Sequence, residues 1–408
     1  MEIAILHYTA PPVVGGVEAI VAEHARLLRA AGYRVRILAG RGGRGEGTTP
    51  MPLLYGRHPE VRAAHRALER GDPHRFERVR DRIAGDLAPY VRNCVLLVHN
   101  VFTVDKNLPL TAALHRLLDR HPEARMVAWT HDLSWADPVR APRLRPEYPW
   151  SLLRTPRPQV CYVAISEAVQ RLLVRTLGLR PEDVSVIPPG VSLESLHPLQ
   201  PRIRQLVNRL RMWERFPVLL APVRITRRKN LEMAVRITAA LRAAGTDPLL
   251  VVTGPPGAHT ATNRDYLGDL KALRDALGLG SHCVFLAELG LRCTSRMIGD
   301  LYFLADAVLL TSVQEGFGLP VAEAALARVP VFCTAIPATE EVAGPHARFF
   351  RLQDPPEEIA RRILTHLTRN PQSALRRRVL ERFTWDRIFR ERMQPLLDRL
   401  LRSAPAGR

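Results

Sequence analysis

The chain has 408 residues, 46% of them hydrophobic and 24% charged, which suits roughly two to three globular domains and excludes a disordered chain. No apolar run approaches the ~18 residues that a membrane-spanning helix requires. The net charge is +19, but 56 of the 59 basic residues are arginine. This skew is typical of a GC-rich genome, so part of the excess charge reflects coding bias.

The five cysteines are scattered, with no two at CxxC spacing, so neither a disulfide framework nor a zinc site is indicated. Residues 1–6 carry no basic stretch and no cleavage site, so we expect no signal peptide. A cytoplasmic protein with reduced thiols is therefore expected. The net charge is also compatible with a peripheral contact to the inner face of the membrane.

The first half of the chain alternates predicted strands with predicted helices. It begins with a strand at residues 3–7, a glycine-containing loop at 11–17, a helix at 18–31 and a strand at 35–39, which is one βαβ unit. Further strands are predicted at residues 95–98, 126–129, 160–165 and 184–187, and further helices at 108–118 and after Ser166. The charged segment 57–92 has helical spacing. Continuous apolar strands between helices predict a parallel sheet covered on both faces.

The same alternation restarts in the second half. Strands are predicted at residues 218–223, 249–253, 284–286, 307–311 and 331–333, and helices at 231–244, 267–277 and 319–327. The sequence therefore predicts two α/β domains of similar size, joined near residues 190–205.

Two glycines, Gly15 and Gly16, follow the first predicted strand. Glycine allows a ligand close to the backbone, and the N-terminus of the following helix favours an anion. The spacing is not GxGxxG, so a dinucleotide-binding motif is not supported. A tight turn between strand and helix remains the alternative.

Two cations, Arg224 and Lys229, follow the first strand of the second half and precede a helix. Ligands of open α/β sheets bind at the carboxyl ends of strands, and cations beside a helix N-terminus suit a diphosphate. The alternative is a basic surface loop. Lys229 is one of only three lysines in an arginine-biased chain, which favours a function.

The segment Glu315-Gly316-Phe317-Gly318-Leu319-Pro320-Val321-Ala322-Glu323 follows the strand at 307–311. Its two glycines expose backbone N–H groups at a helix start, and Glu323 lies one turn into that helix. Free amides suit a phosphate, and a carboxylate accepts hydrogen bonds from two neighbouring hydroxyls. A structural Glu-Gly turn is the alternative.

His131 and Asp132 end a strand of the first half. A single histidine is more often structural than catalytic, but the carboxyl edge of a sheet favours a functional role.

Together these segments resemble the family-4 retaining glycosyltransferases of GT-B fold. The resemblance spans nearly the whole chain and rests on Gly15-Gly16, Thr130-His131-Asp132, Ala164-Ile165-Ser166, residues 187–191, Arg224 with Lys229-Asn230, Thr253-Gly254 and residues 315–323. It implies an α/β protein in which two Rossmann-like, doubly wound domains face each other across a cleft. The implied domains are residues 1–195, on the acceptor side, and 196–384, which bind the nucleotide sugar; a helix at about 385–408 packs back on the first.

The resemblance also implies roles for individual residues. Arg224 and Lys229 would hold the donor diphosphate, Glu323 the ribose hydroxyls, and Glu315 the transferred sugar, which His131 would also contact. The other implied donor-binding residues are Gly15, Gly16, Ser166, Gly254, Gly316, Phe317, Gly318 and Leu319.

The implied activity is that of a hexosyltransferase that uses a UDP- or GDP-hexose, most simply glucose or mannose, with retention and without a cofactor. No Asp-x-Asp pair occurs, so no metal is expected at the diphosphate. A front-face attack is expected, because no carboxylate pair is set for a double displacement.

The expected acceptor carries a hydroxyl on a small, anionic or lipid-linked molecule. An aromatic and basic stretch suggests the residues that bind it, namely Trp135, Arg140, Arg143 and Tyr148, unless this stretch is a plain surface loop. The alternatives are an epimerase or hydrolase on the same fold, or a basic nucleic-acid-binding protein. The last lacks a recognisable nucleic-acid-binding motif, and aromatic residues make up only 6%.

Overall fold

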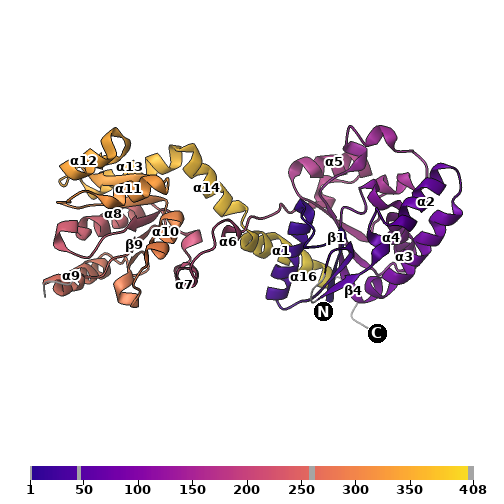
Figure 1. Cartoon of the computed structure of the whole chain (residues 1–408), viewed down its shortest axis with the longest axis horizontal. Helices are drawn as coiled ribbons and strands as arrows, with labels where there is room; N and C mark the ends of the chain where they lie inside the picture. The colour runs from indigo at the N-terminus through magenta and orange to yellow at the C-terminus, as the bar shows by residue number, and fades with distance from the viewer. Residues whose placement is uncertain (1, 44–46, 257–261, 403–408) are drawn as a thin grey trace. The chain divides into compact units, whose positions relative to one another are not determined.

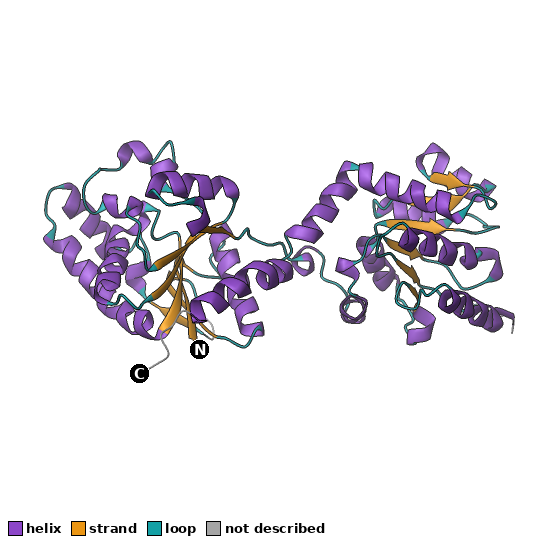
Figure 2. Ribbon diagram, turned by 180° about the vertical axis from the view of Figure 1, so that it is seen from behind, coloured by secondary structure: helices purple, strands orange, loops and turns teal. Residues whose placement is uncertain are grey.

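The computed structural model describes residues 2–43, 47–256 and 262–402. The chain divides into two compact units. Unit 1 comprises Met1–Val191 and Phe383–Arg408, and unit 2 comprises Ser192–Arg382. Each unit has a parallel sheet with helices on its faces (Figures 1 and 2). The α/β class with two Rossmann-like domains is confirmed.

The sheet of unit 1 has the strand order β3-β2-β1-β4-β5-β6-β7 within the described residues. Its strands are β1 (Glu2–Thr9), β2 (Arg34–Arg41), β3 (Thr48–Pro50), β4 (Cys94–His99), β5 (Arg125–Thr130), β6 (Val160–Ala164) and β7 (Val184–Val186). All pairs are parallel, and β1 lies between β2 and β4, with Ile5 opposite Ile37 of β2 on one side and Leu97 of β4 on the other. Strand β3 is not predicted from the sequence, because it is short and lacks an apolar run.

Helices cover both faces of this sheet. They are α1 (Gly16–Ala30), α2 (Pro59–Glu69), α3 (His74–Asn93), α4 (Leu108–Arg120), α5 (Glu167–Leu177), α15 (Trp385–Ile388) and α16 (Gln394–Arg402). Successive β1 residues point to opposite faces, so Ile3 and Ile5 pack with α1, α15 and α16, whereas Ala4 and Leu6 pack with α2 to α5. The predicted C-terminal helix is interrupted by a π-helical turn at Phe389–Met393.

The C-terminal segment joins unit 1 beside the end of β7. Val191 donates its N–H to the carbonyl oxygen of Phe383 at 2.7 Å, and Trp385 is buried. A Cβ at Gly190 would lie 2.7 Å from the Cα of Trp385, so only glycine lets the two segments lie this close. Residues 383–402 therefore contribute to the hydrophobic core of unit 1.

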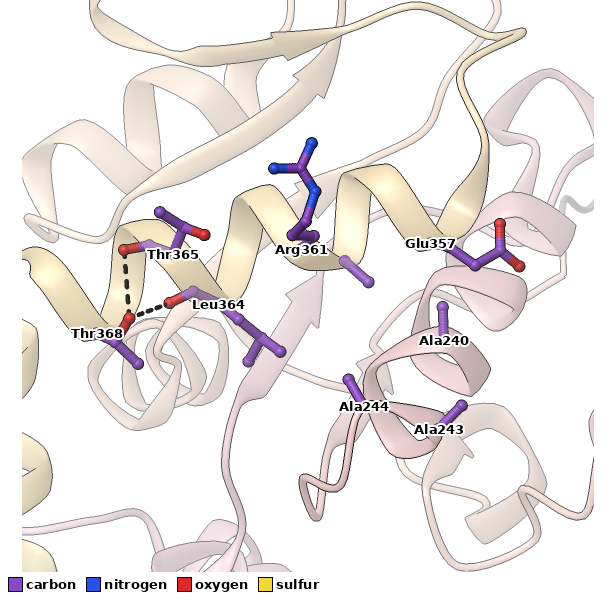
Figure 3. Close-up of a pocket in the computed structure, with 9 residues that line it drawn as sticks. Ala240, Ala243, Ala244, Glu357, Arg361, Leu364, Thr365 and Thr368 are labelled. Carbon is purple, nitrogen blue, oxygen red and sulfur yellow. Dashed lines mark hydrogen bonds between the residues drawn. The ribbon is translucent and has the colours of Figure 1, made fainter.

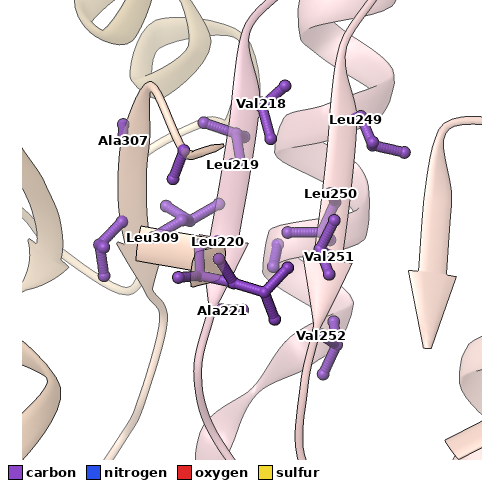
Figure 4. Packing of buried hydrophobic residues seen from close by; sticks show 14 of the residues in the cluster. Val218, Leu219, Leu220, Ala221, Leu249, Leu250, Val251, Val252, Ala307 and Leu309 are labelled. Atoms are coloured by element: carbon purple, nitrogen blue, oxygen red, sulfur yellow. The ribbon is translucent and has the colours of Figure 1, made fainter. Parts of the chain in front are cut away.

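The sheet of unit 2 has the order β10-β9-β8-β11-β12-β13, again all parallel. Its strands are β8 (Val218–Ala221), β9 (Leu249–Val252), β10 (Cys283–Phe285), β11 (Ala307–Leu310), β12 (Val331–Thr334) and β13 (Arg348–Phe350). The central strands are fully apolar and buried on both faces, as Figure 4 shows for β8, β9 and β11. Strand β13 is not predicted from the sequence, because it begins with an exposed arginine and has a single buried residue.

The helices of unit 2 are α6 (Leu193–Leu196), α7 (Pro201–Leu210), α8 (Leu231–Ala243), α9 (Thr262–Ala276), α10 (Ser295–Leu304), α11 (Leu319–Leu326), α12 (Pro337–Ala343), α13 (Pro356–Arg369) and α14 (Pro371–Arg382). A single hydrophobic cluster joins α7, α8, α10 and α13 to the sheet. Burying each large aliphatic side chain of such a cluster contributes about 1.5–3 kcal/mol, so the cluster fixes the positions of the loops at the strand ends.

Candidate functional site

The loop between β1 and α1 leaves open space at Gly16. The helix begins at Gly16 with no side chain capping its N-terminus. A Cβ added at Gly16 would meet nothing within 4 Å, whereas one at Gly15 would clash with the Glu18 carboxylate. Gly16 therefore leaves space for an anion at this helix N-terminus, whereas the Glu18 carboxylate already occupies the space beside Gly15.

Glu18, in the first turn of α1, faces the end of β1. Its carboxylate accepts the hydroxyl hydrogen of Thr9 and lies 3.9 Å from Nε2 of His7. Nδ1 of His7 lies 3.1 Å from the backbone oxygen of His99 at the end of β4. Because a carbonyl oxygen only accepts, Nδ1 carries the proton of His7. The sequence analysis missed both Glu18 and His7.

The predicted pair His131 and Asp132 follows β5 and is held by residues at the end of β4. Nε2 of His131 lies 2.9 Å from Nδ1 of His99. Oδ1 of Asn100 accepts the backbone N–H groups of His131 at 2.7 Å and Asp132 at 3.1 Å. The structure thus places the predicted histidine in a polar network that the sequence analysis did not anticipate.

The histidines of this network are neutral at neutral pH. Burial lowers the pKa of His7 and of His131 to about 4, with the attraction of Glu18 and Asp132 too weak to compensate. Burial also lowers the pKa of His24 to about 3 and that of His99 well below its usual value. The rings of His7, His99 and His131 therefore take part in hydrogen bonds as neutral groups, whereas Nδ1 of His24 has no hydrogen-bond partner among the described residues.

In unit 2, Lys229 and Glu315 form a buried ion pair. The turn Arg227–Lys229 after β8 is fixed to β11 because Thr311 donates its hydroxyl to the carbonyl oxygen of Lys229 at 2.9 Å. The Lys229 ammonium contacts Oε1 of Glu315, which also accepts the Ser312 hydroxyl at 2.6 Å. Two predicted residues, 86 positions apart, are thereby brought together.

The loop from Glu315 to α11 presents free backbone donors. Within the described part of the chain, the N–H groups of Gly316, Phe317 and Gly318 donate to no acceptor. Gly318 has φ +92°, a left-handed conformation that glycine adopts without strain. The side chains of Phe317 and Leu319 are exposed. This arrangement suits an oxyanion at the N-terminus of α11.

Glu323 lies one turn into α11 and is also exposed. Tyr302, near the end of α10, donates its hydroxyl to Oε2 of Glu323 at 2.8 Å. Burial, followed by this carboxylate, raises the pKa of Tyr302, so the phenol stays protonated and donates. Oε1 remains available to accept hydrogen bonds from a ligand. Sequence reasoning did not identify Tyr302.

Arg224 and Gly254 follow neighbouring strands. The Arg224 side chain is exposed and has no partner among the residues that the structure describes. A Cβ at Gly254 would lie 2.3 Å from the Val223 carbonyl oxygen and 2.5 Å from the Cα of Arg224. The role that the structure shows for Gly254 is therefore close packing that supports the Arg224 backbone.

Several predicted residues have structural partners. Ser166 caps α5 by accepting the N–H of Val169 at 3.2 Å. Arg140 pairs with Asp105 at 3.0 Å and with Asp137 at 3.4 Å.

The expected aromatic acceptor residues also have neighbours. The Trp135 indole lies under the guanidinium of Arg154, 4.6 Å away, and Tyr148 accepts a hydrogen bond from Arg80 at 3.2 Å. Among the described residues, the exposed side chain of Arg143 has no partner. Three of the four residues expected to bind the acceptor therefore already have partners within the fold.

A groove of about 430 Å³ lies between α8 and α13 (Figure 3). Its walls include Ala240, Ala243 and Ala244, and the Thr368 hydroxyl donates to the Leu364 carbonyl oxygen at 2.7 Å. None of the predicted site residues lines it, so it is distinct from the polar groups at the strand ends.

Two further features bear on the kind of site. In residues 2–43, 47–256 and 262–402, no three histidine, cysteine, aspartate or glutamate side chains are placed to hold a metal ion. Over the same ranges, no helix combines the length and the apolar character needed to cross a membrane.

Comparison with known proteins gives matches over both units. Residues 14–195 match the family described as Glycosyltransferase Family 4, and residues 206–381 match the family described as Glycosyl transferases group 1.

Individual relatives are distant. The D-inositol 3-phosphate glycosyltransferase of Kineococcus radiotolerans is 33% identical over 184 residues, which cover 43% of this chain and 39% of that protein. The MMP alpha-(1->4)-mannosyltransferase of Mycolicibacterium hassiacum is 24% identical over 292 residues, 69% of this chain and 63% of that protein. The serotype-specific mannosyltransferase WbdA of Escherichia coli is 32% identical over 115 residues, 28% of this chain and 14% of that protein. The chain thus covers less than two thirds of each of these relatives.

A solved structure, HepE of Anabaena in complex with UDP and glucose, is 17% identical with a TM-score of 0.36, covering 98% of this chain and 100% of that one.

Proposed function

Because this chain belongs to glycosyltransferase family 4, we propose that it is a hexosyltransferase of the retaining type. The donor is a nucleoside diphosphate hexose, with UDP or GDP as the nucleotide and glucose or mannose as the sugar. Two of the relatives are named as mannosyltransferases, which supports mannose.

The observation that carries this proposal is the group of charges and free donors at the carboxyl edge of the second sheet. Arg224, which has no partner among the described residues, offers positive charge, and the Lys229 ammonium, although paired with Glu315, has further N–H groups to donate. The N–H groups of Gly316 to Gly318 have no acceptor in the described structure. Glu323 offers a free carboxylate oxygen one helical turn away. A diphosphate joined to a ribose and a hexose presents the matching set of oxyanions and vicinal hydroxyls.

The proposed chemistry needs a stabilised leaving group. The bond from the anomeric carbon to the diphosphate oxygen breaks, and the acceptor oxygen bonds to the same face of the sugar. The acceptor proton passes to the leaving phosphate oxygen. Fixed cations and amides stabilise the charge that develops on the diphosphate without reorganising, and this is where we expect Arg224 and Lys229 to act. Glu315 and His131 would contact the transferred hexose.

For the acceptor, we propose a hydroxyl on a small anionic molecule or a lipid-linked one. One relative is named for D-inositol 3-phosphate, a phosphorylated polyol. Arg143 is the better candidate for such a group than Arg140, because Asp105 and Asp137 already neutralise Arg140. We also propose that the reaction needs no divalent metal, since no Asp-x-Asp pair is available to hold one at the diphosphate.

The test has two stages. A thermal-shift panel of UDP- and GDP-hexoses identifies the donor, and products with candidate acceptors are then analysed by mass spectrometry and by the anomeric NMR coupling constant. A new glycoside with the donor's anomeric configuration, formed equally in EDTA, supports the proposal. An epimerised donor, free hexose alone or an inverted product would refute it. Glu315→Ala should abolish transfer while the thermal unfolding curve still shows a folded protein.

A further inference from the structure

Two consecutive residues at the end of β4 contact the two consecutive residues at the end of β5. His99 meets His131 through their rings, and Asn100 meets the backbone of His131 and Asp132. The sequence offered no sign of these contacts, because His99 looks like the last residue of a buried strand. The proposed function uses His131 but leaves His99 and Asn100 without a role.

Asn100 fixes the backbone of the turn after β5. Its φ of 64° lies in the left-handed region, which asparagine tolerates better than most residues. Oδ1 accepts both N–H groups, and Nδ2 donates to the Asp132 carboxylate at 3.1 Å. The three hydrogen bonds of this amide, one to His131 and two to Asp132, hold the turn after β5 in a single position.

His99 fixes the ring of His131. The His99 side chain is fully buried and stacks on Trp129 at an angle of 22° with 5.8 Å between ring centroids. Its backbone oxygen accepts the Nδ1–H of His7 at 3.1 Å. Burial and the stack on Trp129 keep the ring of His99 from swinging away, so its Nδ1 stays 2.9 Å from Nε2 of His131.

The same contact selects the tautomer of His131. Burial keeps both rings neutral, so one nitrogen of the pair carries the bridging proton and the other accepts. Nε2 of His99 is buried with no partner in the described structure. A proton placed there would leave an unpaired buried N–H, so the favoured arrangement puts the proton of His99 on Nδ1. Nε2 of His131 then accepts, and His131 carries its own proton on Nδ1.

We propose that His99 is a positioning residue that holds the His131 ring in one orientation and in the Nδ1–H tautomer. The consequence for transfer rests on the proposed function, in which His131 contacts the hexose. A neutral imidazole with a fixed Nδ1–H donates to a hydroxyl or ring oxygen of a sugar and needs no reorganisation when the donor binds.

The direct test is ¹⁵N NMR of histidine-labelled full-length protein, with the His131 signals assigned by their loss in His131→Asn. His99→Phe keeps a ring on Trp129 but removes both nitrogens. His24→Phe is the matched control, since His24 is a buried ring that contacts His99 and Trp129 but has no hydrogen bond to His131. We expect the Nδ1–H form of His131 in the wild type and in His24→Phe, and a tautomer mixture in His99→Phe. An unchanged His131 spectrum in His99→Phe would overturn the proposal.

If His99→Phe does not fold, a second pair of variants tests the same contact between His99 and His131. The amide of His99→Asn reaches the position of Nδ1, whereas that of His99→Gln reaches the position of Nε2. We expect Asn to keep the His131 tautomer and Gln to lose it, and the reverse order would refute the positioning role.

Activity gives an independent readout. Misplacing a group that contacts the reacting sugar costs up to roughly a hundredfold in rate, so His99→Phe should lower kcat about 10- to 100-fold with little change in donor KM. His99→Asn should restore part of kcat, and His24→Phe should stay close to the wild type. Equal kcat in His99→Phe and His24→Phe would contradict the role in transfer. If His131→Asn leaves transfer intact, the proposed contact of His131 with the hexose is wrong. The NMR experiment still tests whether His99 holds the His131 ring in one tautomer.

Discussion

Removing the charge of Lys229 tests whether its pair with Glu315 stabilises unit 2. Both side chains are less than a tenth exposed, at 9% and 8%. Lys229→Met keeps the apolar stem and deletes the ammonium, which leaves the Glu315 carboxylate with the Ser312 hydroxyl as its remaining side-chain partner in the described structure. An unpaired buried carboxylate is costly, so the variant should be clearly less stable than the wild type.

The expected magnitude follows from the burial. Breaking a buried ion pair by removing one partner costs about 3–5 kcal/mol. The pair lies at the edge of the sheet, so we expect the lower figure, about 3 kcal/mol. For a unit the size of Ser192–Arg382, each 1 kcal/mol lowers Tm by roughly 2–4 °C, which gives a loss of about 6–12 °C in the transition of unit 2.

Urea unfolding of Lys229→Met, Glu315→Gln and the double variant measures the coupling. The double variant leaves no charge unpaired, so it should recover most of the stability that Lys229→Met loses. Arg227→Met is the control in the same turn, because its pair with Asp269 is exposed, at 60% and 58%, and should contribute at most about 1 kcal/mol. A loss in Lys229→Met no larger than in Arg227→Met, or strict additivity in the double variant, would show that the buried pair does not form.

Three further predictions test other parts of the two units. Burial lowers the pKa of His7 and His131 from 6.5 to about 4. The unfolded chain therefore binds protons first, and stability that is complete above pH 6.5 should fall toward pH 4 by up to roughly 3 kcal/mol per ring; a urea midpoint that is constant from pH 6.5 to 5 would contradict this. Gly254→Ala forces a Cβ against backbone atoms and should cost about 1–3 kcal/mol in chemical unfolding, so wild-type stability would argue against this packing. Tyr302→Phe removes the donor to Glu323 and should weaken nucleoside diphosphate binding by roughly 2- to 10-fold in calorimetry, with unchanged affinity counting against a role for this carboxylate.

The strands that the sequence predicted are those with continuous apolar runs. Cys94–His99 and Val218–Ala221 are buried on both faces, so each residue contributes the same apolar signal. Strand β3 contains only threonine and proline, and β13 begins with an exposed arginine and has a single buried residue, so neither presents an apolar run.

The candidate site was predictable to the extent that it lies at strand ends. Lys229 and Glu315 each follow an apolar run, but their direct contact depends on β8 and β11 being neighbours, which no local pattern reveals. His99 was missed because it ends a buried strand, and Asn100 because its left-handed backbone is a property of the folded turn.

The arginines show a second limit of prediction from sequence. Sequence composition does not distinguish a paired cation from a free one. Arg140 is neutralised by Asp105 and Asp137, whereas Arg224 has no partner among the described residues. The distinction decides which cation can hold an anionic ligand, and it depends on contacts formed only in the folded chain.

The two units place their polar contacts at the same topological position. In each sheet the chain winds outward in one direction from the first strand and then returns to add a strand on its other side, so β1 lies beside β4 in unit 1 and β8 beside β11 in unit 2. Helices that follow these neighbouring strands lie on opposite faces, which leaves the loops apart and the strand ends accessible, and ligands of open α/β sheets bind there. His7 and His99 meet at the end of the first pair, and Lys229 and Glu315 meet just beyond the second. The side chains that follow these strand pairs are therefore the first candidates for ligand binding in each unit. A cationic loop elsewhere on the sheet is an equal candidate only if its cations have no carboxylate partner within the fold.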